Sequence, residues 1–313
     1  MGVTMLLKRN SIHSATVIKL NQSFSVDALK AGSEKLIFKE CKPAQEKTWG
    51  FISANDEIVK DLIFSHGDHH LITIREDVKI PKRSLVARNS QKMIKEKEVS
   101  IKRKLTKPER EEIRTHVKQS LFPVTPTKEK VTQAIYIETK KLLICVDNNL
   151  PQVEVMVDKI NQSIKSQSIQ MNFKASDMKD ELSDTLTTFA LKPDVIPKEY
   201  DFEVGKKLIL KKEKTKASLY EQECDSEEVR VHLMNDKRVE SIELIYKEDL
   251  PFILSSKRTL SHINLKKMVG VEARANLEEE KSDIFAYARG TFILNVNIFL
   301  ELWAAVEKVP NEL

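Results

Sequence analysis

The segment that decides the architecture is residues 79–123, which read KIPKRSLVARNSQKMIKEKEVSIKRKLTKPEREEIRTHVKQSLFP. Pro81 opens it, and proline is tolerated in the first turn of a helix; Pro108 restarts the helical pattern. A narrow apolar strip runs along the segment: Val86, Met93, Ile94, Ile101 and Leu105. The other residues are mostly polar, so we expect a long exposed helix over residues 82–121, ended by Pro123 and Pro126.

Basic residues are concentrated in this predicted helix. The whole chain has a net charge of +5, whereas residues 82–118 contain thirteen basic and five acidic residues, a local charge of +8 that leaves −3 for the rest. A second basic segment, residues 206–216, has six lysines against Glu213. Clustered cations on an extended helix indicate a polyanionic partner. A solvated helix face held by ion pairs has the same pattern, so both interpretations stay open.

The distribution of aromatic residues favours one kind of nucleic acid. No Phe, Tyr or Trp occurs between Asp68 and Leu121. Proteins that bind single strands usually stack the bases on aromatic side chains beside a basic groove. A basic helix without aromatics instead suits the phosphates of a duplex.

The rest of the chain predicts an α+β fold in which strands and helices follow no repeat. We expect strands at residues 14–20, 71–75, 134–138, 142–146, 207–212, 241–246, 252–255 and 283–294. We expect further helices at residues 25–36, 151–166, 176–186 and 296–309. Pro193 and Pro197 mark a boundary. The predicted division is a central region (1–192) with the basic helix, a tip-like subdomain (193–265) and a C-terminal strand and helix (266–313) that pack back on the core.

Several function classes are excluded by the residues that are missing. The chain has seven glycines and no two lie closer than 17 positions apart, so the glycine-rich phosphate loops of nucleotide-driven motors and nicotinamide enzymes are absent. The cysteines Cys41, Cys145 and Cys224 are widely spaced, which predicts neither a zinc site nor a disulfide framework. The apolar run within the first ten residues is too short for a signal peptide. We expect a cytoplasmic protein without a membrane segment.

Two places could carry chemistry. His66, Asp68, His69 and His70 surround a turn at Gly67, but adjacent histidines of a strand point to opposite faces, so we expect a surface turn without a metal. A metal-dependent nuclease could use Asp194 after Pro193, but the next Glu-x-Lys, Glu279 to Lys281, lies in a charged run. We therefore expect no catalytic residue, no metal and no cofactor, with the nuclease kept as an alternative.

Several ordered stretches are similar to a known family. They include Trp49-Gly50-Phe51, Lys79-Ile80-Pro81, residues 105–110 (LTKPER), Ser120-Leu121-Phe122-Pro123 and residues 226–229 (SEEV). Together with the hairpin at residues 134–147 and Phe292-Ile293-Leu294 near the end, this set resembles the RdgC family of bacterial recombination-associated proteins. The similarity is strongest from residue 49 to residue 147 and weak from residue 155 to residue 219.

The resemblance implies an elongated, multi-subdomain α+β subunit that forms a ring-shaped homodimer. The ring would encircle duplex DNA without sequence preference, associate with the nucleoid and limit access of the recombinase RecA. We expect the phosphate contacts at Lys82, Arg83, Arg88, Lys92, Lys95, Lys102, Arg103, Lys104, Lys118, Lys211, Lys212 and Lys214. Where the family usually has Arg-Ala-Phe after Pro123, this chain has Val124-Thr125-Pro126, which puts the role of that turn in question. A protein-interaction module with an acidic partner is the other alternative.

Overall fold

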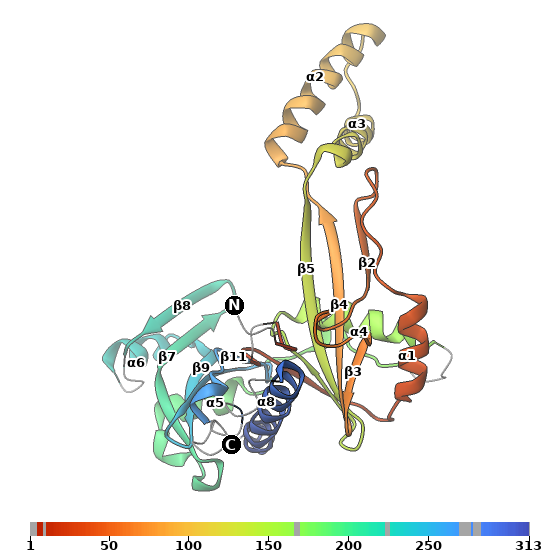
Figure 1. The fold of residues 1–313 in the computed structure, drawn as a ribbon. Helices are drawn as coiled ribbons and strands as arrows, with labels where there is room; N and C mark the ends of the chain where they lie inside the picture. Colours follow the sequence, from red (N-terminus) through yellow and green to blue (C-terminus); the bar gives the residue numbers. More distant parts are fainter. Residues whose placement is uncertain are drawn as a thin grey trace.

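Two antiparallel sheets and a projecting helical arm make up the computed structural model (Figure 1). The structure describes residues 5–8, 11–165, 170–222, 226–268, 277 and 283–312. Figure 1 shows an L-shaped molecule: a long ribbon of β4 and β5 rises from the first sheet and ends in the arm, and the second sheet forms a lobe beside its base. The predicted α+β class is confirmed.

The first sheet has the order β1-β6-β5-β4-β2, and β3 pairs with β4. Its strands are β1 (Thr16–Lys19), β2 (Lys47–Phe51), β3 (Ile63–His66), β4 (His69–Lys79), β5 (Thr127–Ile137) and β6 (Leu142–Cys145). β4 and β5 pair along all of their eleven residues, from His69 opposite Ile137 to Lys79 opposite Thr127. The β5–β6 hairpin confirms the one that the sequence predicts at residues 134–146.

Alternation along β5 divides the core between the two faces of the sheet. Ala134 and Tyr136 are buried against α1 (Val26–Lys35) and α4 (Leu150–Ser163), while Ile135 and Ile137 are buried on the side of the second sheet. α1 and α4 contact each other closely at Gly32, where an added Cβ would lie 1.9 Å from the carbonyl oxygen of Ser163. The glycine is required by this approach of the two backbones.

The second sheet has the order β11-β10-β9-β7-β8. Its strands are β7 (Phe202–Lys212), β8 (Thr215–Tyr220), β9 (Arg238–Tyr246), β10 (Leu250–Ser255) and β11 (Leu260–Ser261). Two helices accompany it, α5 (Ser183–Leu191) and α6 (Glu227–Met234). α5 packs against β9, and a hydrogen bond links the two: the backbone N–H of Val239 donates to Thr187 Oγ1 at 3.0 Å.

The C-terminal segment is one long helix, α8 (Ile284–Glu307), so the strand predicted at residues 283–294 is wrong. Its first half is rich in aromatic and β-branched residues, which favour strands. The buried residues nevertheless recur at helical spacing, as in Ala288, Phe292 and Phe299, and Asp283 caps the helix by accepting from the backbone N–H groups of residues 285 and 286. Burial of this continuous stripe of side chains stabilises the helix relative to a strand.

α8 belongs to a hydrophobic core that contains residues of both sheets. Its length and hydropathy would allow it to span a membrane, but half of its most apolar window is buried inside the protein, as in the core helix of a globular protein. Asn295, 7% exposed, accepts a hydrogen bond from Ser11 Oγ at 2.7 Å inside this core. The predicted domain boundaries stay a prediction, although α5 and α8 both pack across them.

The arm consists of two helices, α2 (Arg83–Ile101) and α3 (Lys107–Ser120), so the single long helix predicted over residues 82–121 is wrong. The chain reverses because Lys102, the C-cap of α2, has the left-handed φ of 53°. Leu105, Ile113 and Val117 then form a small core of their own with partly buried residues of α2. The reversal covers part of the apolar strip: Leu105 is buried and Val86 and Ile94 are partly buried, whereas Met93 and Ile101 remain exposed.

Candidate nucleic-acid interface

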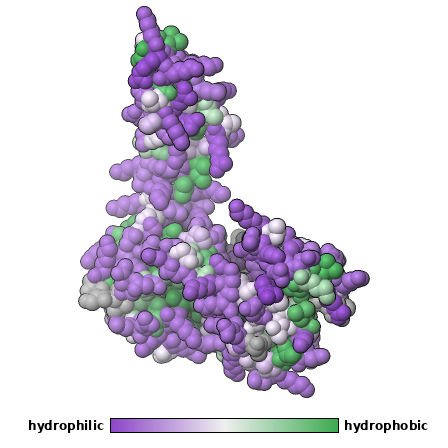
Figure 2. All heavy atoms as spheres, turned by 180° about the vertical axis from the view of Figure 1, so that it is seen from behind, coloured by the Kyte–Doolittle hydropathy of each residue, from purple (hydrophilic) through white to green (hydrophobic). Residues whose placement is uncertain are grey.

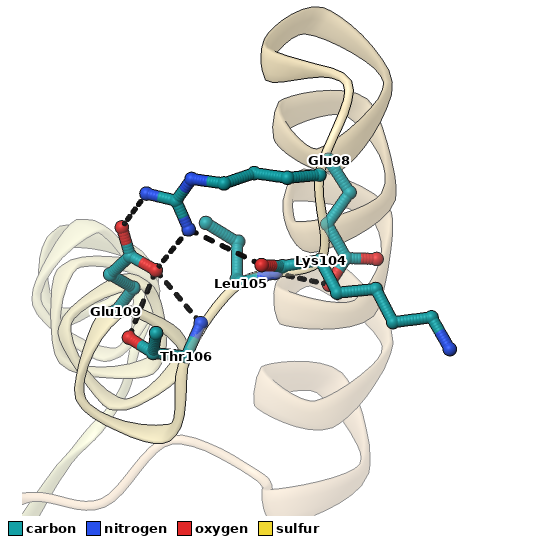
Figure 3. A network of polar contacts seen from close by, with 6 residues as sticks. Glu98, Lys104, Leu105, Thr106 and Glu109 are labelled. Carbon is teal, nitrogen blue, oxygen red and sulfur yellow. Dashed lines mark hydrogen bonds and ion pairs between the residues drawn. The ribbon is translucent and has the colours of Figure 1, made fainter.

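A network of charged side chains fixes the turn between α2 and α3 (Figure 3). Arg103 donates to both carboxylate oxygens of Glu109, at 3.0 and 2.6 Å, and to the carbonyl of Lys104 at 3.2 Å. Glu109 also accepts from the backbone N–H of Thr106 at 2.8 Å, and the Thr106 side chain accepts from the backbone N–H of Glu109, so the two residues form a capping box at the start of α3. The Thr106 hydroxyl lies 2.9 Å from the Glu109 carboxylate. On the other side, Glu98 accepts from the backbone N–H of Leu105 at 2.9 Å.

These contacts lower the pKa of two carboxyl groups. The hydrogen bonds from Arg103 and Thr106 lower the pKa of Glu109 to about 2. The pKa of Glu98 is lowered by the backbone N–H of Leu105 and by Arg110, whose guanidinium donates to it at 3.0 Å. Both acids therefore stay ionised, and each neutralises one arginine of the arm.

Most cations of the arm have no such partner. Of the thirteen basic residues between positions 82 and 118, all of which the structure describes, four form ion pairs: Arg103, Arg110, Arg114 and Lys118. The other nine form none within the described residues: Lys82, Arg83, Arg88, Lys92, Lys95, Lys97, Lys102, Lys104 and Lys107. All nine are exposed, and we call them the free cations of the arm.

Three of the free cations form a stripe along α2. Arg88, Lys92 and Lys95 follow one another at spacings of four and three residues, which places them on one helix face. Like charges at this spacing destabilise an isolated helix by about 0.2–0.5 kcal/mol per pair. A polyanion bound along the helix would remove that repulsion. Within the described residues, no acid forms an ion pair with any of these three side chains.

The structure does not bring the predicted site residues into one set. Lys82, Arg83, Arg88, Lys92, Lys95, Lys102 and Lys104 are free cations of the arm, and Lys97 and Lys107 join them although the sequence interpretation did not select them. Arg103 is held by Glu109, and Lys118 forms an ion pair with Glu46 at 2.6 Å. A count of acids within one helical turn does not reveal the second pair, because Glu46 lies 72 positions away.

The lysines predicted in the second lobe lie on the β7–β8 hairpin, away from the arm (Figure 1). Lys211 pairs with Glu240 at 3.5 Å, and Lys212 pairs with Asp236 at 3.1 Å. Lys214 is exposed in the turn between the strands and has no ion pair among the described residues. The hairpin therefore offers fewer available charges than its six lysines suggest.

Exposed apolar side chains accompany the charges on the arm. Figure 2 shows a mostly hydrophilic arm with scattered hydrophobic residues. They are Ile80 (65% exposed), Met93 (37%), Val99 (79%), Ile101 (39%) and Val124 (75%). Val124 belongs to the short 3-10 helix η1 (Phe122–Val124), in which Phe122 is buried. A pair of helices with so small a core gains stability if a second surface covers these residues.

The histidine turn carries no metal site within the described residues. His66 is exposed, as expected for a surface turn, but His70 is only 5% exposed, which corrects that expectation for this residue. Its Nδ1 lies 2.9 Å from Ser65 Oγ, and burial lowers its pKa. Of the nuclease alternative, Asp194 is exposed in the short 3-10 helix η3 (Pro193–Val195), while Glu279 and Lys281 lie outside the described residues.

Comparison with known proteins places these features in a family context. The sequence model of one family, described as "Putative exonuclease, RdgC", matches residues 11–309. The chain is similar to the recombination-associated protein RdgC of Shewanella halifaxensis, with 22% identity over 274 residues that cover 86% of each chain. It is also 22% identical over 306 residues to the protein of that name from Shewanella sediminis, covering 93% of this chain and 97% of the relative.

Proposed function

This chain belongs to the RdgC family, and we propose that it binds double-stranded DNA without sequence preference and thereby modulates homologous recombination. The observation that carries the proposal is the set of free cations on the arm. Nine exposed basic side chains without acidic partners lie on two adjoining helices and their turn. Contacts from such charges to phosphates release counterions, and this release drives binding that does not read the bases.

The composition of the arm supports a duplex as the partner. The helices offer Lys and Arg side chains but no Phe, Tyr or Trp on which an unpaired base could stack. Their acids are few, and the ones nearest the turn are already occupied by arginines. An acidic protein could bind the same charges, and the binding experiment described below distinguishes the two partners.

We further propose that two subunits close into a ring around the DNA. A closed ring of two subunits needs two separate contacts, each related by the two-fold axis. The exposed apolar residues of the arm, such as Val99 and Val124, supply one surface for such a contact. In a ring, DNA would be held by encirclement together with phosphate contacts, and it would be less accessible to RecA-type recombinases. The protein would then act by binding, associated with the nucleoid in the cytoplasm, and without catalysing a reaction.

Fluorescence anisotropy of a labelled duplex, titrated with protein at several salt concentrations, tests the proposal. We expect a steep salt dependence, equal affinity for unrelated sequences, and single strands that compete no better than duplex. Absence of binding even at low salt would contradict the proposal and favour a protein partner. Degradation of the duplex in Mg²⁺ or Mn²⁺, lost in Asp194→Ala, would instead favour the nuclease.

A further inference from the structure

A polar pocket lies along the edge of β5 that β6 leaves unpaired. Figure 1 shows that β5 borders the open corner of the L, on the side of the second lobe. The pocket has a volume of about 300 Å³, and its walls come from the N-terminal segment, β5 and the residues that follow β6. The residues that matter here are Lys8, His13, Gln133 and Asp147. We call it the corner pocket.

The pocket exists because β5 is longer than its neighbour β6. β6 pairs only with residues 134–137 of β5, and the last contact beyond it is the backbone N–H of Val146, which donates to the carbonyl of Gln133 at 2.9 Å. Above this point, no described strand continues the sheet on that side of β5. The unpaired edge is therefore available to side chains and to a ligand.

Lys8 is held at this edge by a buried glutamine. Gln133, 5% exposed, accepts from the backbone N–H of Lys8 at 2.8 Å and donates to the carbonyl of Leu6, also at 2.8 Å. The ammonium of Lys8 donates to the carbonyl of Val131 at 3.2 Å. An ammonium has three N–H donors, so this contact leaves two for a ligand. The charge is thus positioned before any ligand arrives, which lowers the entropic cost of binding.

The other groups of the pocket define the class of ligand. His13 adds an imidazole, whose Nδ1 lies 3.2 Å from the carbonyl oxygen of Ile263, and Asp147 is the single acid of the lining, with one oxygen that accepts from the backbone N–H of Asn149 at 2.9 Å. The side chain of Lys130 belongs to the opposite face of β5, which it shares with Ala134, and it contributes no charge here. Ser11, Ser14 and Asn148 contribute hydroxyl and amide groups, and no Phe, Tyr or Trp lines the pocket. Such a set suits a tetrahedral oxyanion.

We propose that the corner pocket binds a backbone phosphate of the duplex, and this inference rests on the proposed function. The arm and the second lobe lie on either side of the corner (Figure 1), so DNA that contacts the free cations of the arm can also reach the pocket. Lys8 would supply the charge, and Gln133 would act as a positioning residue. The site would fix the depth of the DNA in the corner without selecting a sequence.

The test compares the salt dependence of duplex binding by Lys8→Gln with that of Lys35→Gln. Lys35 is exposed at the end of α1, on the far side of the ribbon. Its substitution changes the net charge by the same amount as Lys8→Gln but leaves the pocket intact. Loss of one phosphate contact reduces the slope of log K against log salt by about 0.9. We expect that reduction for Lys8→Gln and none for Lys35→Gln.

Gln133→Leu provides a second measurement, because it keeps the Lys8 side chain but removes its support. We expect the variant to bind duplex as weakly as Lys8→Gln while retaining the far-ultraviolet spectrum of the unmodified protein. Pocket variants that bind like Lys35→Gln, while a variant without the α2 stripe (Arg88→Gln/Lys92→Gln/Lys95→Gln) binds weakly, would overturn the corner pocket alone. If the unmodified protein binds no duplex, the proposed function fails and the pocket with it.

Discussion

Arg103 and Glu109 form a two-point ion pair, with nitrogen–oxygen distances of 3.0 and 2.6 Å, across the turn that folds α3 back on α2. The pair joins the beginning of the turn, just after the C-cap of α2, to the first turn of α3. It also removes Arg103 from the free cations of the arm. The same contact therefore shapes the arm and selects which of its charges are available.

The titration of Glu109 should reveal this contact. Its folded pKa is about 2, below the usual value of 4.5, so the contact favours the folded arm above the usual value and is lost as pH falls toward 2. We expect a carbon NMR titration of this carboxyl group to give a midpoint near 2. In Arg103→Gln the midpoint should return toward 4.5, and an unchanged midpoint would contradict the assigned partner.

Glu109→Gln should loosen the start of α3 at neutral pH. The substitution removes the ionised acceptor of the capping box and the partner of Arg103. We expect faster amide hydrogen exchange over residues 104–110, measured by mass spectrometry, and unchanged exchange in the two sheets. Glu112→Gln is the matched control, because Glu112 is exposed on the same helix and forms no ion pair among the described residues. Equal exchange in the two variants would count against the Arg103–Glu109 ion pair as a support of the turn, because glutamine still offers a carbonyl oxygen to the capping box.

The stripe on α2 should contribute more to DNA binding than paired lysines do. Arg88→Gln/Lys92→Gln/Lys95→Gln removes three free cations, and loss of three phosphate contacts should reduce the salt slope by about 2.7. The control Lys118→Gln/Lys211→Gln/Lys212→Gln removes the same charge from residues held in ion pairs. We expect affinity to fall by at least about tenfold in the first variant. Equal losses would mean that net charge, and not the stripe, governs binding.

The exposed valines of the arm should matter for self-association. Val99→Asp/Val124→Asp places two charges on residues that are 79% and 75% exposed in the single subunit. Folding should be retained, whereas an arm-to-arm contact would have to desolvate both carboxylates. We expect sedimentation to show weaker association than for Val155→Asp, a control at a half-exposed position on α4. A dimer of unchanged strength would place the contact elsewhere.

Gly32→Ala should destabilise the protein although alanine is the better helix former. At an ordinary helix position the change stabilises by roughly 0.5–1 kcal/mol. Here the new methyl group would lie 1.9 Å from the carbonyl oxygen of Ser163, so α1 and α4 must separate. Overpacking of this kind costs about 1–3 kcal/mol, measurable by urea unfolding. A more stable variant would show that the two helices do not approach so closely.

Local signals in the sequence predicted much of the fold. Ser25 is the N-cap of α1, Pro108 lies in the first turn of α3, and the alternating residues of β5 and β6 form the hairpin expected there. The prediction failed where local preference and tertiary burial differ. The residues of α8 before Leu294 have strand propensity, but their helical spacing lets one stripe contact the core of both sheets. The reversal at Lys102 was missed because a lysine, and not a glycine, takes the left-handed conformation.

By itself, the sequence determined that the positive charge is concentrated between residues 82 and 118 and that no aromatic residue accompanies it. Only the tertiary structure decided which of those charges are available. A basic residue can pair with an acid that lies far away in the chain, as Lys118 does with Glu46. The sequence does not show which acids come close to which basic residues. The corner pocket has the same origin, because Lys8 and Gln133 are 125 positions apart and meet only after β5 has paired with its neighbours. Charge is a property of composition, whereas its compensation depends on distances that folding sets.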